Sequence, residues 1–268
     1  MPKNVVAVER VNTHSNKTTN TKFSSKIKKA FTLAEVLITL TIIGVVSALA
    51  IPSIHNNFKA AQLQTEFKKA QYELNQLSQF IQSDLRINNL YKTFYSESIT
   101  VAHQKGLQTI VEKYYQRINN APQKHIVGKT YDRNGNEIFY KNFSNTTNMN
   151  ARILDDGGFE LRDGRAIWLE GGFKNTRFMI TYDLNGIDKG PNRYGYDLFS
   201  FILSQNGLFY PAGSDQVNDK GLTYLDCQKD FTINKEKSCS LSDESNCNGI
   251  GCAYQASINP NYFKELKY

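Results

Sequence analysis

Hydrophobic and polar positions follow different patterns along the chain, and each pattern predicts a different element. Residues 1–27 are polar and show no hydrophobic periodicity, which is typical of an unstructured segment. Residues 31–51 are uncharged except for Glu35. As a helix that rises about 1.5 Å per residue, this run spans about 31 Å, which matches the hydrocarbon core of a bilayer. The run therefore predicts a membrane-spanning helix.

Beyond Pro52 the apolar positions become one-sided. They recur at steps of three and four residues, which places them on one stripe of a helix, while Lys68 and Glu73 take other faces. The stripe consists of Leu63, Phe67, Ala70, Leu74, Leu77, Ile81 and Leu85. We expect the helix to continue through Pro52 and the stripe to cover one face of a sheet. Residues 101–118 are compatible with a second helix.

From Phe159 onward the apolar period falls to two, which predicts strands. The first two strands flank an Asp-Gly turn at Asp163 and so predict a hairpin. The predicted strands are residues 159–161, 166–168, 177–184 and 198–203, followed by the apolar run 208–210. Strands joined by such short turns favour an antiparallel meander, so the predicted fold class is α+β.

Most of the net positive charge precedes the apolar run. Residues 1–30 hold seven Lys and Arg against one acid, a net charge of +6, while the whole chain carries +7. Positive charge just before a span keeps that side cytoplasmic, so we expect the residues after the span to be exported. The remainder carries only +1, and its charge gives no indication of a nucleic-acid partner.

The four cysteines lie close to the carboxyl end, at Cys227, Cys239, Cys247 and Cys252. An exported location would let them form disulfides, in one of three connectivities that their spacing does not separate. A zinc site is the competing interpretation. It is disfavoured because the chain has no C-x-x-C pair and the nearest histidine is His125.

Glu35 lies one turn inside the apolar run. Burying a charge at that depth costs on the order of 2.5 to 3.5 kcal/mol, so the carboxylate needs a partner. No Lys, Arg or His lies between residues 31 and 54. We therefore expect the partner to come from outside this helix, or the carboxylate to sit near the lipid headgroups.

Residues 28–40, which read KKAFTLAEVLITL, resemble the cleavage and methylation signature of type IV prepilins and type II secretion pseudopilins. In that family a basic leader ends at a small residue, a Phe follows, and a Glu stands fifth in the mature chain. Gly44 and Pro52 also fall where the family favours them. The resemblance covers about the first quarter of the chain. One position departs from it, because Ala30 stands where the family usually has Gly.

The resemblance implies a specific chemistry at the start of the helix. A prepilin peptidase of the inner membrane would cut between Ala30 and Phe31 and then methylate the new amine of Phe31. In a filament, the carboxylate of Glu35 would pair with the amino terminus of a neighbouring subunit. This pairing would supply the opposite charge that Glu35 needs in a low-dielectric environment.

The resemblance also implies an organisation and a location. The fold would be pilin-like, with one long helix packed on an antiparallel sheet and a cysteine-containing tail from residue 222. The expected parts are a cleaved leader (1–30), a spanning half-helix (31–52), an amphipathic half-helix (53–90) and an exported domain (91–268). The protein would cross the inner membrane once, with a cytoplasmic amino terminus and a periplasmic or extracellular domain. Its partners would be other pilin or pseudopilin subunits, the inner-membrane assembly platform and membrane lipid.

Oxygen-bearing side chains gather around glycines between the third and fourth predicted strands. Asp183, Asn185, Asp188 and Asp197 are the ingredients of a calcium loop, although their spacing does not match an EF-hand. The stretch resembles segments of pseudopilin-like proteins, and major pseudopilins carry calcium in the same region. Turn chemistry is the alternative, because Asn-Gly and Gly-Pro-Asn form turns whether or not they bind an ion. Calcium is the one cofactor that the sequence suggests.

The sequence does not indicate an enzyme, because it lacks G-x-S-x-G, H-E-x-x-H, P-loop and G-x-G-x-x-G motifs. The leading hypothesis is a structural subunit, a pilin or pseudopilin. One alternative is a minor tip pilin whose residues 222–268 form an adhesive or DNA-contacting surface. Acidic side chains offset the lysines of that tail, so no phosphate-binding patch is indicated. A third reading is a receptor that uses a pilin-like anchor only.

Overall fold

The computed structural model describes residues 31–96, 101–150, 153–170, 178–217 and 239–267. Contacts along the chain separate two compact units, one up to Leu49 and one from Ala50, and each is described by itself. The helices are α1 (Leu33–Leu85), α2 (Leu90–Ser96), α3 (Val101–Arg117), α4 (Cys252–Ile258) and α5 (Tyr262–Glu265), with a 3-10 turn η2 at Asp215–Val217. The strands are β1 (Pro122–Ile126), β2 (Gly158–Leu161), β3 (Ala166–Glu170), β4 (Met179–Asp183), β5 (Leu198–Leu203) and β6 (Phe209–Pro211).

The first unit contains the start of α1. Of the helices that the structure describes, α1 alone is long and apolar enough to cross a membrane, and none of its most apolar window is buried. Pro52 lies inside α1, and the helix continues through it as the sequence predicts. A helix that is apolar on all sides and unburied requires a lipid or protein environment that the isolated chain does not supply.

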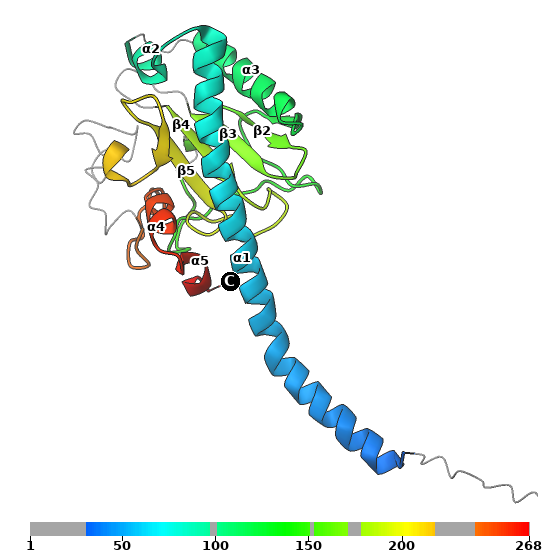
Figure 1. Cartoon of the computed structure of the whole chain (residues 1–268). Coiled ribbons are helices and arrows are strands. Elements are labelled where there is room, and N and C mark those ends of the chain that lie inside the picture. Colours follow the sequence, from blue (N-terminus) through cyan, green and yellow to red (C-terminus); the bar gives the residue numbers. More distant parts are fainter. Residues whose placement is uncertain (1–30, 97–100, 151–152, 171–177, 218–238, 268) are drawn as a thin grey trace, which may run out of the picture. The chain divides into compact units, whose positions relative to one another are not determined.

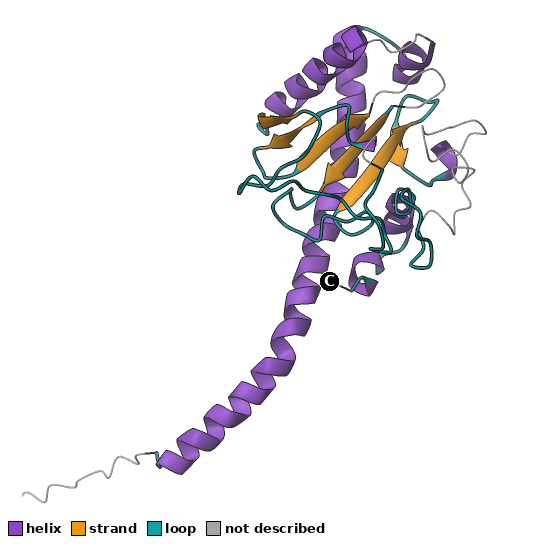
Figure 2. Cartoon of the chain, turned by 180° about the vertical axis from the view of Figure 1, so that it is seen from behind, coloured by secondary structure: helices purple, strands orange, loops and turns teal. Residues whose placement is uncertain are grey.

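The second unit is built on one sheet of six strands. The strands pair in chain order from β1 to β6, and every pairing is antiparallel, which confirms the predicted meander (Figure 2). The hairpin of β2 and β3 and the strand β5 lie where the sequence predicts them. Strand β1, which reads Pro-Gln-Lys-His-Ile and exposes its three central residues, is not predicted by the sequence pattern. An edge strand of this kind lacks the alternation that identifies a strand.

The stripe of α1 packs against one face of this sheet, with α3 beside it (Figure 1). Six of the seven predicted stripe residues are buried, and Leu85 at the helix end is exposed. Phe67 lies at the centre, with its ring centroid 5.0 Å from that of Phe199 and 5.5 Å from that of Phe201. Phe263 of α5 approaches the same ring to 5.9 Å. The predicted long helix on an antiparallel sheet is therefore a pilin-like α+β fold.

The opposite face of the sheet is buried as well. Figure 2 shows loops over this face, and a second apolar cluster lies beneath them. Trp168 of β3 belongs to it, with its ring edge-on to Tyr140 at a centroid distance of 5.3 Å. Strands β3, β4 and β5 are consequently buried at every position. One covered face is expected from the sequence, because the loops of residues 129–150 and 187–197 carry no periodic pattern that assigns them a packing role.

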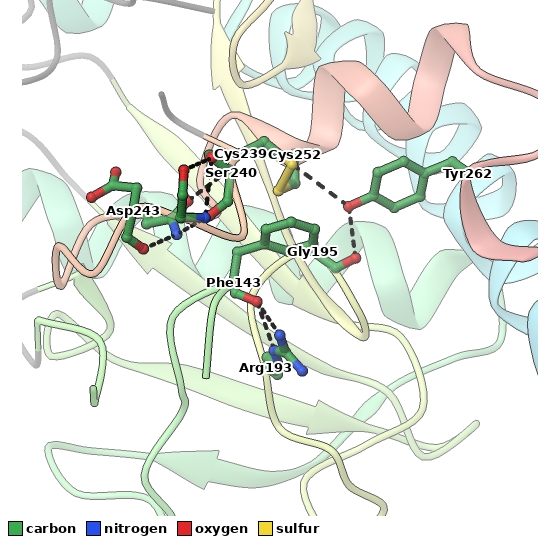
Figure 3. The surroundings of a disulfide bond; sticks show 10 residues. Phe143, Arg193, Gly195, Cys239, Ser240, Asp243, Cys252 and Tyr262 are labelled. Atoms are coloured by element: carbon green, nitrogen blue, oxygen red, sulfur yellow. Dashed lines mark hydrogen bonds between the residues drawn. A yellow bond between two sulfur atoms is a disulfide. The ribbon is translucent and has the colours of Figure 1, made fainter. Parts of the chain in front are cut away.

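The carboxyl-terminal segment is fixed to the sheet by a disulfide and by aromatic packing. Cys239 and Cys252 form this disulfide, and only one of the three possible connectivities contains that pair (Figure 3). The hydroxyl of Tyr262 donates to the carbonyl of Gly195 at 2.8 Å. Cys227 lies outside the described residues. The structure thus contains one of the predicted disulfides, which lies next to the apolar core that α1 covers.

The position of Phe67 predicts a large loss of stability for Phe67→Ala. Its side chain is 2% exposed between three aromatic rings, so the variant should lose about 3–5 kcal/mol of unfolding free energy. Trp168, the single tryptophan of the chain, reports guanidinium unfolding of the full chain in detergent by its fluorescence. Tyr72→Ala is the matched control on the same helix, because Tyr72 is 65% exposed. Equal losses for the two variants would contradict the packing described here.

Candidate functional site

The start of α1 is closed by reciprocal hydrogen bonds between Thr32 and Glu35. The Thr32 backbone N–H and hydroxyl both donate to Oε2 of Glu35, at 2.8 and 2.9 Å. In return, the Glu35 backbone N–H donates to the Thr32 hydroxyl oxygen at 3.2 Å. This arrangement is a capping box, which satisfies donors that a helix start otherwise leaves without partners.

The capping box corrects one expectation about Glu35. Its carboxylate does have partners within the chain, although these are neutral donors and not a cation. The sequence contains the signal for these hydrogen bonds, since Thr-x-x-Glu before an apolar run is the sequence pattern of a capping box. Both Thr32 donors bind Oε2, and no hydrogen bond to Oε1 is found among the described residues. One carboxylate oxygen therefore remains available to a further donor.

The predicted cleavage junction lies at the edge of the described residues. Ala30 is outside them, while Phe31 precedes the helix and is 84% exposed. Phe31 thus lies directly before the capping box that closes the first turn of α1. The assignment of Ala30 and Phe31 to cleavage, and of Phe31 to methylation, stays a prediction.

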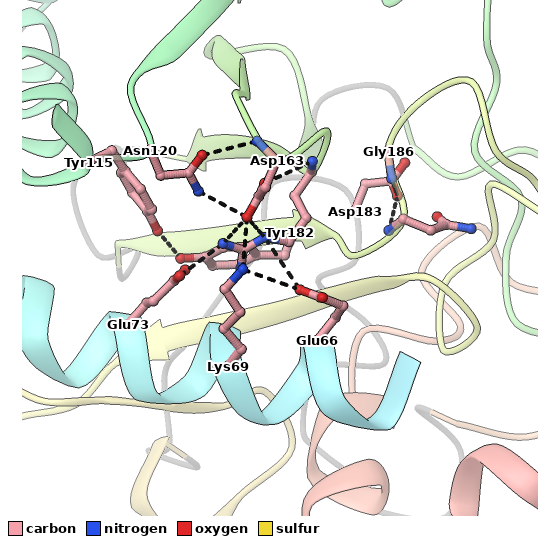
Figure 4. A network of polar contacts seen from close by, with 11 residues as sticks. Glu66, Lys69, Glu73, Tyr115, Asn120, Asp163, Tyr182, Asp183 and Gly186 are labelled. Carbon is pink, nitrogen blue, oxygen red and sulfur yellow. Dashed lines mark hydrogen bonds and ion pairs between the residues drawn. The ribbon is translucent and has the colours of Figure 1, made fainter. Parts of the chain in front are cut away.

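A buried ionic network joins the domain half of α1 to the turn between β2 and β3 (Figure 4). Arg165 is 2% exposed, and its Nη2 lies 2.9 Å from Oε1 of Glu73 and 2.7 Å from Oδ2 of Asp163. Lys69 approaches the same Asp163 oxygen to 2.9 Å, and the Asn120 side chain donates to it at 3.0 Å. The network thus links α1, the segment between α3 and β1, and the hairpin.

Glu73 differs from its expected position. The sequence places it off the apolar stripe, yet it is only 6% exposed, because Arg165 enters from the sheet and provides the opposite charge. The two buried charges neutralise each other, which offsets part of the cost of burying them, although Oε2 of Glu73 and Nη1 of Arg165 have no hydrogen-bond partner among the described residues. For Asp163, burial alone would raise the pKa, but the hydrogen bonds and charge of Arg165 outweigh it and hold the pKa at about 2. These groups join α1 to the hairpin of β2 and β3.

The four predicted calcium ligands have other contacts. Oδ1 of Asp183 accepts the backbone N–H groups of Asn185 and Gly186, at 3.2 and 2.8 Å, and its Oδ2 accepts the hydroxyl of Tyr140 at 2.7 Å. The N–H groups of residues 192 and 193 bind the two carboxylate oxygens of Asp197 at 2.9 and 2.8 Å. N–H and O–H donors around a carboxylate stabilise turns and do not resemble the coordination of a cation.

Of the remaining two predicted ligands, Asp188 is engaged through its carboxylate, whereas Asn185 is engaged through its side-chain N–H and its Oδ1 has no hydrogen-bond partner among the described residues. Asp188 pairs with Arg133, whose Nε lies 2.5 Å from Oδ2, and the side-chain amide of Asn185 donates to the carbonyl of Gly190 at 3.2 Å. Burial raises the pKa of both Asp183 and Asp197, and the charge of Asp197 raises that of Asp183 further. These contacts favour the alternative interpretation, in which the four residues stabilise turns. Calcium binding by them stays a prediction.

Comparison with known proteins bears on the start of α1. Residues 25–51 match the family model of the prokaryotic N-terminal methylation motif, which is the signature of type IV pilins and pseudopilins. The match covers the predicted cleavage junction, the capping box and the apolar run. No curated protein and no solved structure matched the chain. The motif is that of prepilin peptidase substrates and structural subunits, and together with the apolar helix it indicates a membrane-anchored protein.

The low pKa of Asp163 predicts how acid affects stability. Its folded pKa of about 2 lies below the ordinary 3.8, so its contribution is complete above about pH 4 and is lost as the pH falls toward 2. The contribution amounts to about 2 kcal/mol, and Asp163→Asn should remove it. The measurement is the unfolding free energy of wild type minus variant, followed from pH 5 to pH 2.

Asp84→Asn is the control for this experiment. Asp84 pairs with Lys113 at the surface, so its removal should change stability by less than about 1 kcal/mol at any pH. A pH-independent difference between wild type and Asp163→Asn would show that the ionic network does not stabilise the fold in its charged form.

Proposed function

We propose that this chain is a pilin or pseudopilin, the structural subunit of a type IV pilus or type II secretion filament. A prepilin peptidase cuts it between Ala30 and Phe31, methylates Phe31, and the subunit then assembles through its N-terminal helix. The observation that carries this proposal is the methylation motif at residues 25–51, which coincides with the capped start of an apolar helix.

The arrangement along the chain supports the proposed topology. The basic leader of residues 1–30 stays in the cytoplasm, residues 31–52 cross the inner membrane, and the domain lies in the periplasm or outside the cell. The disulfide between Cys239 and Cys252 agrees with this side, because disulfides persist in oxidising compartments. Partners are the peptidase, other pilin subunits, the assembly platform and lipid. The tip-pilin alternative rests on residues 222–268, of which 222–238 lie outside the described residues.

The geometry of Glu35 supports a role in assembly. The capping box holds the carboxylate at the helix start through Oε2, while Oε1 can accept a hydrogen bond from the methylated amine of a neighbouring subunit. This ion pair would form in lipid or at a helix interface, where an isolated carboxylate is costly. The cap orients the group in the monomer, and the neighbour supplies the positive charge.

Glu35→Gln separates these two roles. Glutamine also forms capping boxes, so the helix start is retained while the charge is removed. We expect the variant to accumulate in the membrane at wild-type level and to lose filament assembly by at least about tenfold, because the ion pair cannot form. The measurement is the amount of sheared surface filament or cross-linked multimer relative to membrane-bound subunit.

Two variants serve as controls. Thr32→Val removes the capping hydroxyl but keeps the charge of Glu35, and it should retain most assembly. Thr39→Val removes a hydroxyl that donates only to the carbonyl of Val36 within the same helix, and it should assemble as wild type. Normal assembly of Glu35→Gln would exclude the pairing role and favour a protein that uses the helix as an anchor only.

A further inference from the structure

Three carboxylates from two separate segments meet at the end of β3. Glu170 is the last residue of β3, and Asp155 and Asp156 lie in the segment that leads into β2. Each offers an oxygen that lies within 4.8 Å of the others. The cluster belongs neither to the methylation motif, nor to the loop of residues 183–197, nor to the network around Arg165. No function described above uses it.

Glycines bring the two segments together. Gly157 has a φ of +107°, which L-residues rarely adopt, and its carbonyl accepts the N–H of Leu169 at 3.0 Å. A Cβ added to Gly158 would lie 2.1 Å from the carbonyl oxygen of Ile167, so only glycine permits this approach. The backbone of residues 157–158 therefore lies directly against β3 and places the two aspartates beside Glu170.

The buried member of the cluster has an oxygen without a partner. Glu170 is 4% exposed, and its Oε2 has no hydrogen-bond donor among the described residues. The side chain of Glu170 also shares a hydrogen bond with Asp156, so these two acids are in direct contact. Asp155 is exposed and Asp156 half-buried, so the cluster opens to solvent on one side.

We propose that Asp155, Asp156 and Glu170 bind a divalent cation, and that Ca²⁺ is the ion whose chemistry this donor set suits. All donors are carboxylate oxygens, which hard cations prefer and which soft metals that need thiolate or imidazole do not. Ca²⁺ accepts six to eight oxygens in flexible geometry, so water can complete the shell on the open side. The ion would join the segment before β2 to the end of β3. This proposal does not rest on the proposed function.

The test uses the full chain in detergent after removal of metals. Tb³⁺ serves as a luminescent substitute for Ca²⁺, excited through Trp168, the single tryptophan, which lies two residues before Glu170 on β3. We expect sensitised Tb³⁺ luminescence that added Ca²⁺ competes away, and a rise of the thermal midpoint with Ca²⁺ concentration. Absence of both responses in the wild-type protein would overturn the proposal.

Substitutions test whether these three residues bind the ion. The double variant Asp155→Asn/Asp156→Asn and the single variant Glu170→Gln should each weaken the Ca²⁺ response by at least about tenfold. Asp188→Asn tests the competing acidic loop, and the response should survive this substitution if the ion binds at Glu170. Asp84→Asn, which removes a surface acid of α1, is the control and should leave the response unchanged. If Glu170→Gln fails to fold, the double variant alone tests the site. Asp155 and Asp156 both lie toward the open side, so their substitution should disturb the fold less. An unchanged response in the double variant, or loss in Asp188→Asn alone, would refute the assignment.

Discussion

The packing of α1 on the sheet is the interaction on which the rest of the domain depends. The helix contributes an apolar stripe with Phe67 at its centre. This stripe packs against aromatic residues of β5 in the sheet. A buried ion pair between Glu73 and Arg165 crosses the same interface. Removing one member would leave an uncompensated buried charge, which typically costs about 3–5 kcal/mol. The helix therefore packs on the sheet through both its apolar stripe and this ion pair.

Two glutamates of α1 show how one helix serves two environments. Glu73 is enclosed, and Arg165 of the same chain satisfies its charge. Glu35 receives only neutral donors from Thr32 and keeps one oxygen without a hydrogen bond among the described residues. The first carboxylate has its opposite charge within the monomer, whereas the second lacks a positive charge. That difference explains why we place the domain contact at Glu73 and the proposed contact between subunits at Glu35.

Much of this architecture could be predicted from sequence, because the signals are local and periodic. The apolar run, the stripe beyond Pro52 and the Asp-Gly hairpin are of this kind. The strand β1 could not be found, since three of its five residues face solvent. The burial of Glu73 depends on Arg165, 92 residues later, and no periodicity reports such a pairing.

Other features depend on tertiary structure and could be recognised only from the fold. Asp155 and Asp156 approach Glu170 only through the register of β2 against β3, so residue spacing could not identify the cluster. The pairing of Cys239 with Cys252 likewise depends on where α4 lies. The capping box of Thr32 and Glu35 was the exception, since its pattern is local and was present in the sequence.

The central claim is that this chain is a prepilin whose leader ends at Ala30. The most direct test is mass spectrometry of the protein purified from its native membrane, compared with protein from a strain that lacks the prepilin peptidase. We expect a chain that begins at N-methylated Phe31 in the first sample and an intact leader in the second. A leader that remains in both samples, or a first residue other than Phe31, would contradict it.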